Sequence, residues 1–192
     1  MKLHFFLSIF CLLNFSSFSH IDELTDKEKA YRDSIKALNI KNENIAKSKE
    51  AYNLGIKLYS EKKFIDAIEE FKKSINLDST FIAAYYNKGV AENENQNYND
   101  AIKTMNKLIA LKPKHSSAFF QRARAYQQLN NYLKSEEDYE RAIKLDNTNY
   151  KSYYNYGTLR FMQKDYDGAI YYFSKAIELE KELINADRKS VV

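Results

Sequence analysis

Side chains that could support catalysis are few and poorly grouped in this sequence. The acidic run at residues 136–138 is flanked by Lys134 and Arg141, which favours a solvated helix surface over a pair of catalytic carboxylates. Cys11 is the only cysteine and the 3 histidines are scattered, so neither thiol catalysis nor a nitrogen and sulfur metal cage is indicated. The glycines are single, without a phosphate-binding loop. We therefore expect no catalytic residues, no metal, no cofactor and no enzyme.

A different pattern recurs along the chain. A tyrosine or phenylalanine ring is followed directly by a side-chain amide, at four places spaced 34 residues apart. Rings supply contact area, and side-chain amides can bond a peptide backbone without reading its sequence. The pattern favours recognition of a protein or an extended peptide. The four pairs are Tyr52 with Asn53, Tyr86 with Asn87, Phe120 with Gln121, and Tyr154 with Asn155.

These pairs belong to a longer repeat of 34 residues that organises the chain. Each copy predicts two amphipathic helices, with a polar turn in mid-repeat and a second turn at its end. We place the copies at 48–81, 82–115, 116–149 and 150–183, with end turns near Asp78, Pro113, Asn147 and Lys181. Equivalent positions form five columns: Gly55, Gly89, Ala123 and Gly157; Phe64, Tyr98, Tyr132 and Tyr166; Ala67, Ala101, Ser135 and Ala169; Phe71, Met105, Tyr139 and Phe173; and Leu77, Leu111, Leu145 and Leu179.

The glycine column predicts a close approach of the two helices in each repeat. Glycine inside a helix costs about 1 kcal/mol relative to alanine, so its return in one register needs a packing reason. We expect the column of Ala67 to be the facing small surface, with Leu54 and Phe71 closing over the contact.

The composition is that of an all-helical globular chain. Hydrophobic residues make up 44% and charged residues 29% of the 192 residues, while 4 glycines and 1 proline leave little material for tight hairpins. A net charge of +4, with acids and bases interspersed, is too small for a nucleic-acid footprint.

The N-terminal segment, residues 1–19, has the layout of a secretory signal. Lys2 precedes an apolar run, and small residues follow at Ser17 and Ser19, after which we expect cleavage. An uncleaved signal anchor is the alternative, although the run is shorter than the ~20 residues of a spanning helix. Phe10 stands where lipoprotein processing needs a small residue. We expect an exported, periplasmic or envelope-associated protein, and the rich use of Lys, Asn, Ile and Tyr indicates an AT-rich, bacterial source.

The segments that flank the repeats carry weaker patterns. Residues 20–47 are polar, with an apolar stripe at Tyr31, Ile35 and Leu38 that predicts one short helix, capped by Thr25 and Glu28, as a tether or N-terminal cap. At the other end, residues 184–192 begin a fifth repeat that gives way to DRKSVV. A common sequencing-adapter DNA encodes the same six residues in one frame. We hypothesise that the native chain continues past residue 186 and that this tail is an artefact; a naturally ragged end is the alternative.

The columns resemble the tetratricopeptide repeat over about 135 residues. Three residues depart from the family pattern. Lys88 and Arg122 stand where leucine is usual, and Leu108 stands where a small residue is usual, which we interpret as tolerated variation with long stems reaching solvent.

The resemblance implies an all-α fold, a right-handed solenoid of helical hairpins whose first helices line a concave groove. In this sequence the groove would carry the four aromatic and amide pairs together with Val90, and Asn93, Arg124 and Gln127 one turn along would contribute selectivity. The expected partner-binding residues are therefore Tyr52, Asn53, Tyr86, Asn87, Val90, Asn93, Phe120, Gln121, Arg124, Gln127, Tyr154 and Asn155.

Some members of the family dock chaperone C-termini through a clamp of lysines, asparagines and an arginine. Two alignments of that clamp on this chain are possible, and each retains a single matching residue, Asn87 in one and Lys151 in the other. We therefore expect no carboxylate-clamp docking. The matching places are Tyr52, Ile56, Asn87, Ser117 and Gln121 in the first alignment, and Tyr86, Val90, Gln121, Lys151 and Asn155 in the second.

Together these features predict a non-catalytic scaffold that binds a protein or peptide in its groove, within a bacterial envelope assembly. The alternative is the N-terminal recognition arm of a longer enzyme or sensor. A cytoplasmic co-chaperone is a third possibility, which the signal layout and the missing clamp disfavour.

Overall fold

The computed structural model describes residues 26–190, with side chains described as far as residue 184. This part of the chain is built from α-helices without a strand, which confirms the predicted all-α fold class. The predicted signal segment lies outside the described residues, as does Thr25. The helices are α2 (Asp26–Ser60), α3 (Phe64–Leu77), α4 (Ile82–Glu94), α5 (Tyr98–Leu111), α6 (Ser116–Gln128), α7 (Tyr132–Leu145), α8 (Tyr150–Met162) and α9 (Tyr166–Ser190).

The chain divides into two units, Met1–Glu43 and Asn44–Val192. The described part of the first unit is the N-terminal portion of α2, whose side chains are all exposed, with the stripe residues Tyr31 and Leu38 at 70% and 55%. We expected one separate short helix in residues 20–47. Instead α2 runs without a break from Asp26 to Ser60, and Asn44 and Ala46 stand where the later boundary has Asp78 and Thr80.

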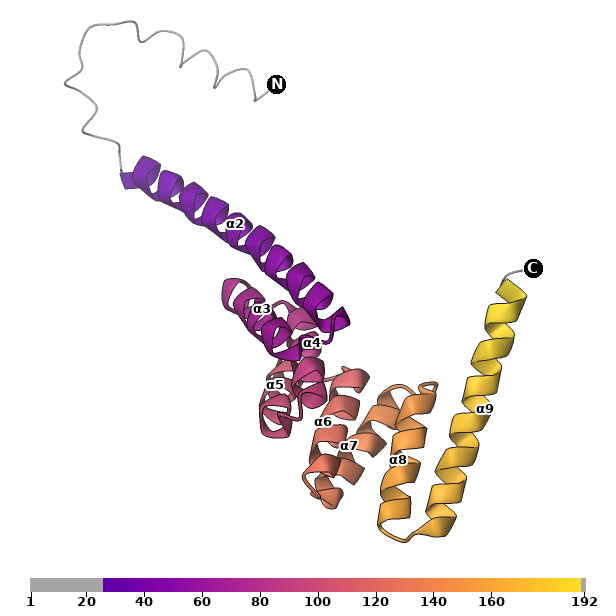
Figure 1. Cartoon of the computed structure of the whole chain (residues 1–192). Coiled ribbons are helices and arrows are strands. Elements are labelled where there is room, and N and C mark those ends of the chain that lie inside the picture. Colours follow the sequence, from indigo (N-terminus) through magenta and orange to yellow (C-terminus); the bar gives the residue numbers. More distant parts are fainter. Residues whose placement is uncertain (1–25, 191–192) are drawn as a thin grey trace, which may run out of the picture. The chain divides into compact units, whose positions relative to one another are not determined.

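In the second unit, helices pair in the predicted order (Figure 1). The hairpins α4–α5, α6–α7 and α8–α9 follow one another, and each second helix also contacts the first helix of the next hairpin. A hairpin with one apolar side left uncovered is stabilised by stacking on its neighbour, which produces a solenoid.

The mid-repeat turns fall where the sequence places them, and one residue in each has a left-handed backbone. Lys62, Gln96, Asn130 and Lys164 have φ values between 57° and 64° and recur every 34 residues. Side chains other than glycine and asparagine are disfavoured there, so the repeat carries the same local strain in three of its four turns.

The end turns of the first three repeats are also confirmed, while the fourth is not formed. Two of them share an Asx turn: the Thr80 N–H donates to Asp78 Oδ1 at 2.9 Å, and the Thr148 N–H donates to Asp146 Oδ1 at 3.1 Å. Our prediction of a turn near Lys181 was wrong, since α9 continues to Ser190. In the register of Asp146 and Thr148 this helix has Glu180 and Glu182, so the residues of that Asx turn are missing.

The glycine column marks a close helix approach, but against the large residues rather than the small ones. A methyl group at Gly55 would lie 2.6 Å from Phe71 Cε1, and one at Gly157 would lie 2.8 Å from Phe173 Cδ1. Our expectation for Leu54 was also wrong, because that side chain is 44% exposed. The small column is itself deeply buried, with Ala67, Ala101 and Ser135 at 0% exposure.

Two departures from the family pattern are paired rather than solvated. Arg122 donates from Nε and Nη2 to the two carboxylate oxygens of Asp138, both at 2.7 Å. Lys88 pairs with Glu92 and also donates to Thr104 Oγ1 at 3.0 Å. Asp138 is 5% exposed, so the acidic run at 136–138 is not the uniformly solvated surface that we expected. Burial raises the pKa of Asp138, and the Arg122 guanidinium opposes that shift.

Candidate partner-binding groove

The predicted groove residues of successive repeats meet on one side of the second unit. Each first helix contacts the next one, α4 with α6 and α6 with α8, and side chains form hydrogen bonds between repeats. Asn87 Nδ2 donates to the Tyr52 hydroxyl at 2.9 Å, and Asn93 Nδ2 donates to the Gln121 carbonyl at 2.9 Å. The amide ladder therefore bonds from repeat to repeat and holds the surface in one arrangement.

At the N-terminal end of this surface lies an open hollow of about 610 Å³. The Tyr86 ring stacks on the His115 ring with centroids 5.5 Å apart, and the Tyr52 and Phe81 rings lie 4.9 Å apart. Rings, amides and hydroxyls thus converge from the end turn and from α4 and α6. The hollow is lined by Asp78, Thr80, Phe81, Ile82, Ala83, Tyr86, Asn87, His115 and Ser117.

His115 lies in this hollow and caps the next helix. Its Nδ1 accepts a hydrogen bond from the Ala118 N–H at 3.2 Å, which caps the N-terminus of α6. Burial, and secondarily the charge of Lys112, lower the pKa of His115 below its ordinary 6.5. A neutral imidazole stacked on Tyr86 makes the hollow suited to an apolar or aromatic group rather than to an anion.

In the middle of the surface, the predicted selectivity residues form a polar network. Arg124 donates to Glu94 Oε1 at 3.2 Å and to Gln121 Oε1 at 3.1 Å. Asn93 is 5% exposed, and no described side chain donates to its Oδ1. Among the predicted groove residues in the described part of the chain, it is the buried side-chain oxygen without a hydrogen-bond partner, while Arg124 stays half-buried beside it.

Three predicted groove residues are largely enclosed by the packing. Phe120 is 7% exposed and belongs to the core cluster of Tyr139 and Tyr156. Gln127 is 7% exposed, accepts a hydrogen bond from the Tyr139 hydroxyl at 2.8 Å and donates to Met162 Sδ at 3.3 Å. Gln121 is 6% exposed. These three side chains expose little surface to a partner, contrary to what their register led us to expect.

The remaining predicted residues lie at the surface to different degrees. Tyr154 is 57% exposed, Asn53 is exposed, and Val90 is half-buried. Asn155 is half-buried, but its Nδ2 donates to the Lys151 carbonyl of its own helix at 2.8 Å. Only Tyr154 among these presents a large free apolar surface.

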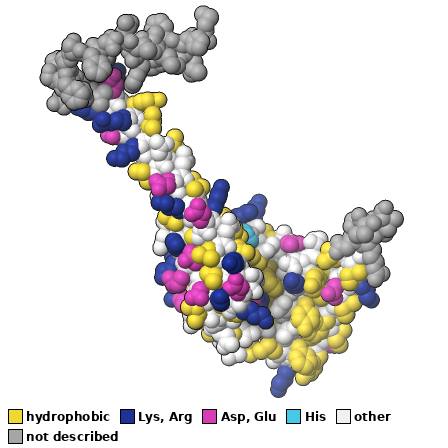
Figure 2. All heavy atoms as spheres, turned by 45° about the horizontal axis from the view of Figure 1, so that its top comes forward, with side chains coloured by type: hydrophobic (Ala, Val, Ile, Leu, Met, Phe, Trp, Pro, Cys, Tyr) yellow, Lys and Arg dark blue, Asp and Glu magenta, His cyan; other side chains and the backbone are white. Residues whose placement is uncertain are grey.

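Our sequence reasoning missed the apolar character of the last repeat. Phe161 and Met162 on α8 are 57% and 44% exposed, and Phe161 packs edge-on against Tyr166 with centroids 5.7 Å apart. Hydrophobic side chains gather over the region of α8 and α9 on the face drawn in Figure 2. The signal was available, because Phe161 and Met162 lie 34 residues after Gln127 and Gln128.

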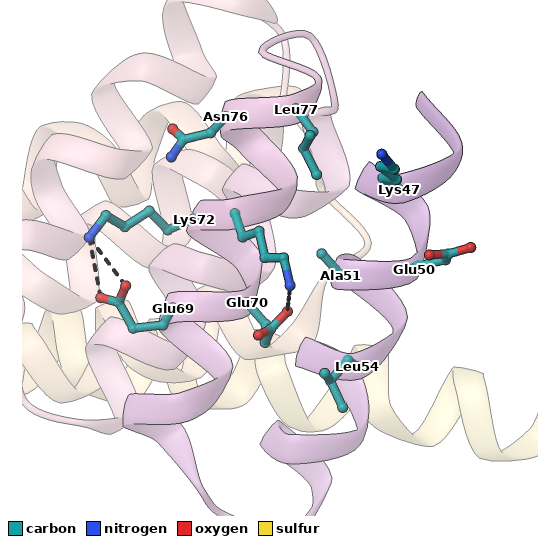
Figure 3. A pocket seen from close by; sticks show the side chains of 10 residues that line it. Lys47, Glu50, Ala51, Leu54, Glu69, Glu70, Lys72, Asn76 and Leu77 are labelled. Atoms are coloured by element: carbon teal, nitrogen blue, oxygen red, sulfur yellow. Dashed lines mark hydrogen bonds and ion pairs between the residues drawn. The ribbon is translucent and has the colours of Figure 1, made fainter. Parts of the chain in front are cut away.

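A second hollow, of about 670 Å³, lies between α2 and α3 of the first hairpin (Figure 3). Charged side chains dominate it: Lys72 pairs with Glu69 at 3.2 Å and Lys73 pairs with Glu70 at 3.5 Å, each within one turn of α3. Such exposed pairs contribute little to stability. Without convergent apolar groups, this hollow is a weaker binding candidate than the groove.

Potential metal ligands do not cluster in the described part of the chain. Among the side chains described between residues 26 and 184, no three His, Cys, Asp or Glu residues lie close enough together to hold a metal ion. No helix over the same residues is long and apolar enough to cross a membrane. What the surface offers is contact area and hydrogen bonds, the means of binding another macromolecule.

Stacked helical hairpins with a ladder of side chains along their first helices define the class of helical-repeat interaction proteins. Family profiles for the tetratricopeptide repeat match residues 82–115 and residues 120–182. The chain belongs to the tetratricopeptide repeat family, and it is a protein–protein interaction scaffold, as members of this family generally are. A comparison with curated protein sequences found no match.

Solved structures share the fold over most of the chain. MamA residues 41 to the end from Desulfovibrio magneticus RS-1 match with a TM-score of 0.66 and 24% identity, covering 83% of this chain and 98% of that one. Another MamA crystal structure matches with a TM-score of 0.64 and 27% identity, covering 82% of each chain. The first tetratricopeptide domain of Spaghetti (RPAP3), bound to an HSP90 peptide, matches with a TM-score of 0.58 and 21% identity over 63% of this chain and 94% of its own.

Proposed function

We propose that this scaffold binds an extended segment of a partner protein along the surface formed by α4, α6 and α8. The observation that carries the proposal is the convergence of rings and amides from successive first helices, with Tyr86 and Asn87 at one end and Tyr154 at the other. Alternating apolar sockets and amides suit an extended chain, whose side chains and backbone bonds alternate in the same way.

The two ends of the groove have different chemistry, which supports one preferred orientation of the bound segment along the groove. The hollow at Tyr86 and His115 is aromatic, neutral and bounded by hydroxyls of the end turn. The end at Phe161 and Met162 is open and apolar, and methionine adapts its shape to varied apolar partners. We infer a partner segment with an aromatic or aliphatic side chain that is buried in the hollow at one end, and a large apolar side chain that packs on Phe161 and Met162 at the other end.

An exported location within a bacterial envelope assembly is part of the same proposal. It rests on the layout of Lys2, the apolar run and Ser19, which lie outside the described residues. Expression of the full chain in a bacterial host, followed by fractionation, tests it: a shortened chain in the periplasm supports export, and a full-length chain in the cytoplasm contradicts it. The carboxylate clamp is absent, so a partner other than a chaperone C-terminus is expected.

The groove proposal is tested by affinity capture with a matched pair of variants. Tyr154→Ala removes a ring that is 57% exposed on the groove, and Tyr171→Ala removes one that is also 57% exposed, on α9. Both variants lose the same exposed area, so folding effects are similar. We expect captured partners to fall at least tenfold for Tyr154→Ala alone. Equal recovery from both variants would contradict the proposal.

A further inference from the structure

A small polar hollow lies at the C-terminal ends of α4 and α6, apart from the aromatic hollow at Tyr86. Its volume is about 190 Å³. This is below the about 300–1,000 Å³ of pockets that hold a whole small ligand, so it has room for a single side chain. It is lined by Asn93, Glu94, Gln96, Tyr98, Arg124 and Gln128.

The side-chain amide of Asn93 is bonded at one atom and unpaired at the other. Its Nδ2 donates to the backbone carbonyl and to the side-chain Oε1 of Gln121, at 2.9 and 3.2 Å. Two acceptors at that place fix which end of the amide is nitrogen, so the other atom is the oxygen. Asn93 is 5% exposed, and its Oδ1 accepts no hydrogen bond from the described residues. An unpaired buried acceptor is costly, so a ligand that supplies a donor recovers that cost.

The next repeat shows why this oxygen is unpaired. Gln127 stands in the register of Asn93, and both ends of its amide are bonded, to the Tyr139 hydroxyl at 2.8 Å and to Met162 Sδ at 3.3 Å. In the register of Tyr139 the second repeat has Met105, whose thioether has no proton to donate. The stacking of repeats therefore does not require an unpaired amide, and the second repeat simply lacks the donor.

The ion pair that lines the same hollow supplies two more polar contacts. Arg124 donates from Nη1 and Nη2 to a single oxygen, Glu94 Oε1, at 3.3 and 3.2 Å, so Glu94 Oε2 lies outside the pair. The two side chains are 35% and 36% exposed, so they can shift to admit a group that reaches Asn93. Because their opposite charges lie side by side and cancel, the hollow favours a neutral polar group over a charged one.

A primary amide matches these three groups. Its two N–H groups donate to Asn93 Oδ1 and Glu94 Oε2, and its carbonyl accepts from Arg124. A hydroxyl has one donor for the two acceptors. A carboxylate has no donor and is repelled by Glu94, while an ammonium or guanidinium group is repelled by Arg124. The protein side chains that carry a primary amide are those of asparagine and glutamine.

We propose that this hollow is a specificity pocket for an asparagine or glutamine side chain of the bound segment. The pocket rests on the proposed groove, since the same segment must lie across α4 and α6. Tyr86 and Asn93 are seven residues apart on α4, which is about 10 Å along the helix axis. An extended segment spans that distance in about three or four residues. The amide should therefore lie that far along the segment from the side chain held at Tyr86.

Selection from a phage-displayed library of random dodecapeptides on the full chain tests the pocket. Among peptides with an aromatic or aliphatic anchor, we expect Asn or Gln to be enriched at least fivefold at the stated spacing. In Arg124→Glu, two carboxylates lie beside Asn93, so the enriched residue should change to Lys or Arg. A damaged fold cannot produce this new preference. Arg141→Glu is the matched control, because Arg141 on α7 is exposed and outside the hollow, and it should keep the amide preference.

The outcomes separate the pocket from the groove. A change to Lys or Arg in Arg124→Glu, with Asn or Gln retained in Arg141→Glu, supports the pocket. An anchor without an amide preference, or an unchanged amide preference in Arg124→Glu, overturns the pocket and leaves the groove standing. Selected peptides that bind Tyr86→Ala and Tyr154→Ala as tightly as the wild type, or a library without binders, overturn the groove and the pocket with it.

Discussion

The glycine column allows one substitution to be compared in two repeats whose nearest packing partners differ, Phe71 in the first and Met105 in the second. Gly55→Ala places a methyl group 2.6 Å from the ring of Phe71, which is 0% exposed. Gly89→Ala places the same group against the terminal methyl of Met105, which is equally buried. The rigid ring can move only as a whole, while the methionine end can rotate away.

The expected magnitudes follow from two opposing terms. Alanine is favoured over glycine inside a helix by about 1 kcal/mol at both sites. Overpacking a closed core costs about 1–3 kcal/mol, and this term applies in full at Phe71. We expect Gly55→Ala to lower the free energy of unfolding by up to about 2 kcal/mol, and Gly89→Ala to change it by less than about 1 kcal/mol in either direction.

Urea denaturation followed by circular dichroism measures both values. Adding Phe71→Met to Gly55→Ala gives the first repeat the methionine that lies beside the glycine in the second repeat. The double variant should therefore recover most of the lost free energy of unfolding. If Gly89→Ala is as destabilising as Gly55→Ala, or if Phe71→Met gives no recovery, the packing account of the column is refuted.

Three further predictions concern the turns, the buried ion pair and the capping histidine. Gln96→Gly should raise the free energy of unfolding by about 0.5–1 kcal/mol by relieving left-handed strain, and Asn130→Gly by less, because asparagine tolerates that conformation; thermal unfolding checks the order. Arg122→Ala should lower the free energy of unfolding by about 3 kcal/mol, because it leaves Asp138 buried and unpaired. The fourth repeat has Tyr156 and Tyr172 at these two places, so the double variant Arg122→Tyr with Asp138→Tyr should lower it by under about 1 kcal/mol. Denaturant unfolding of the two variants measures the difference. Because the pKa of His115 is lowered in the folded chain, the unfolded chain binds the proton more readily. The contribution of His115 to the free energy of unfolding is therefore complete above pH 6.5 and is lost as the pH falls below that value. His115→Asn retains an acceptor for the helix cap, so its free energy of unfolding should depend less on pH between 7.5 and 5.5.

The repeat period made most of the fold predictable from the sequence. Columns 34 residues apart predicted the helix pairs and seven of the eight turns, and two of the end turns use the same residues, Asp78 with Thr80 and Asp146 with Thr148. The predicted turn at Lys181 and the predicted break before residue 48 were wrong. At these two places the register holds Glu180 with Glu182 and Asn44 with Ala46 instead of the Asp and Thr of the Asx turn, so the helix continues past the repeat boundary.

The groove was less predictable, because register places a residue on a helix but not its depth in the packing. Phe120 occupies the same column as Tyr86 and Tyr154, yet the neighbouring Tyr139 draws it into the core. Asp138 lies in an acidic run and is buried because Arg122 reaches it from the paired helix. Both outcomes depend on contacts between α6 and α7, the two helices of the third repeat, and the 34-residue register does not show which side chains meet across them.

The most direct test of the central claim places a photoreactive benzoylphenylalanine at residue 154 on the groove or at residue 171 on α9. The two positions have the same 57% exposure, so random collisions should label them equally. In extracts of the source organism, we predict a discrete cross-linked partner from residue 154, reduced at least tenfold by Asn87→Ala, and none of that partner from residue 171. The same partner in equal yield from both positions, or insensitivity to Asn87→Ala, would contradict binding in the groove.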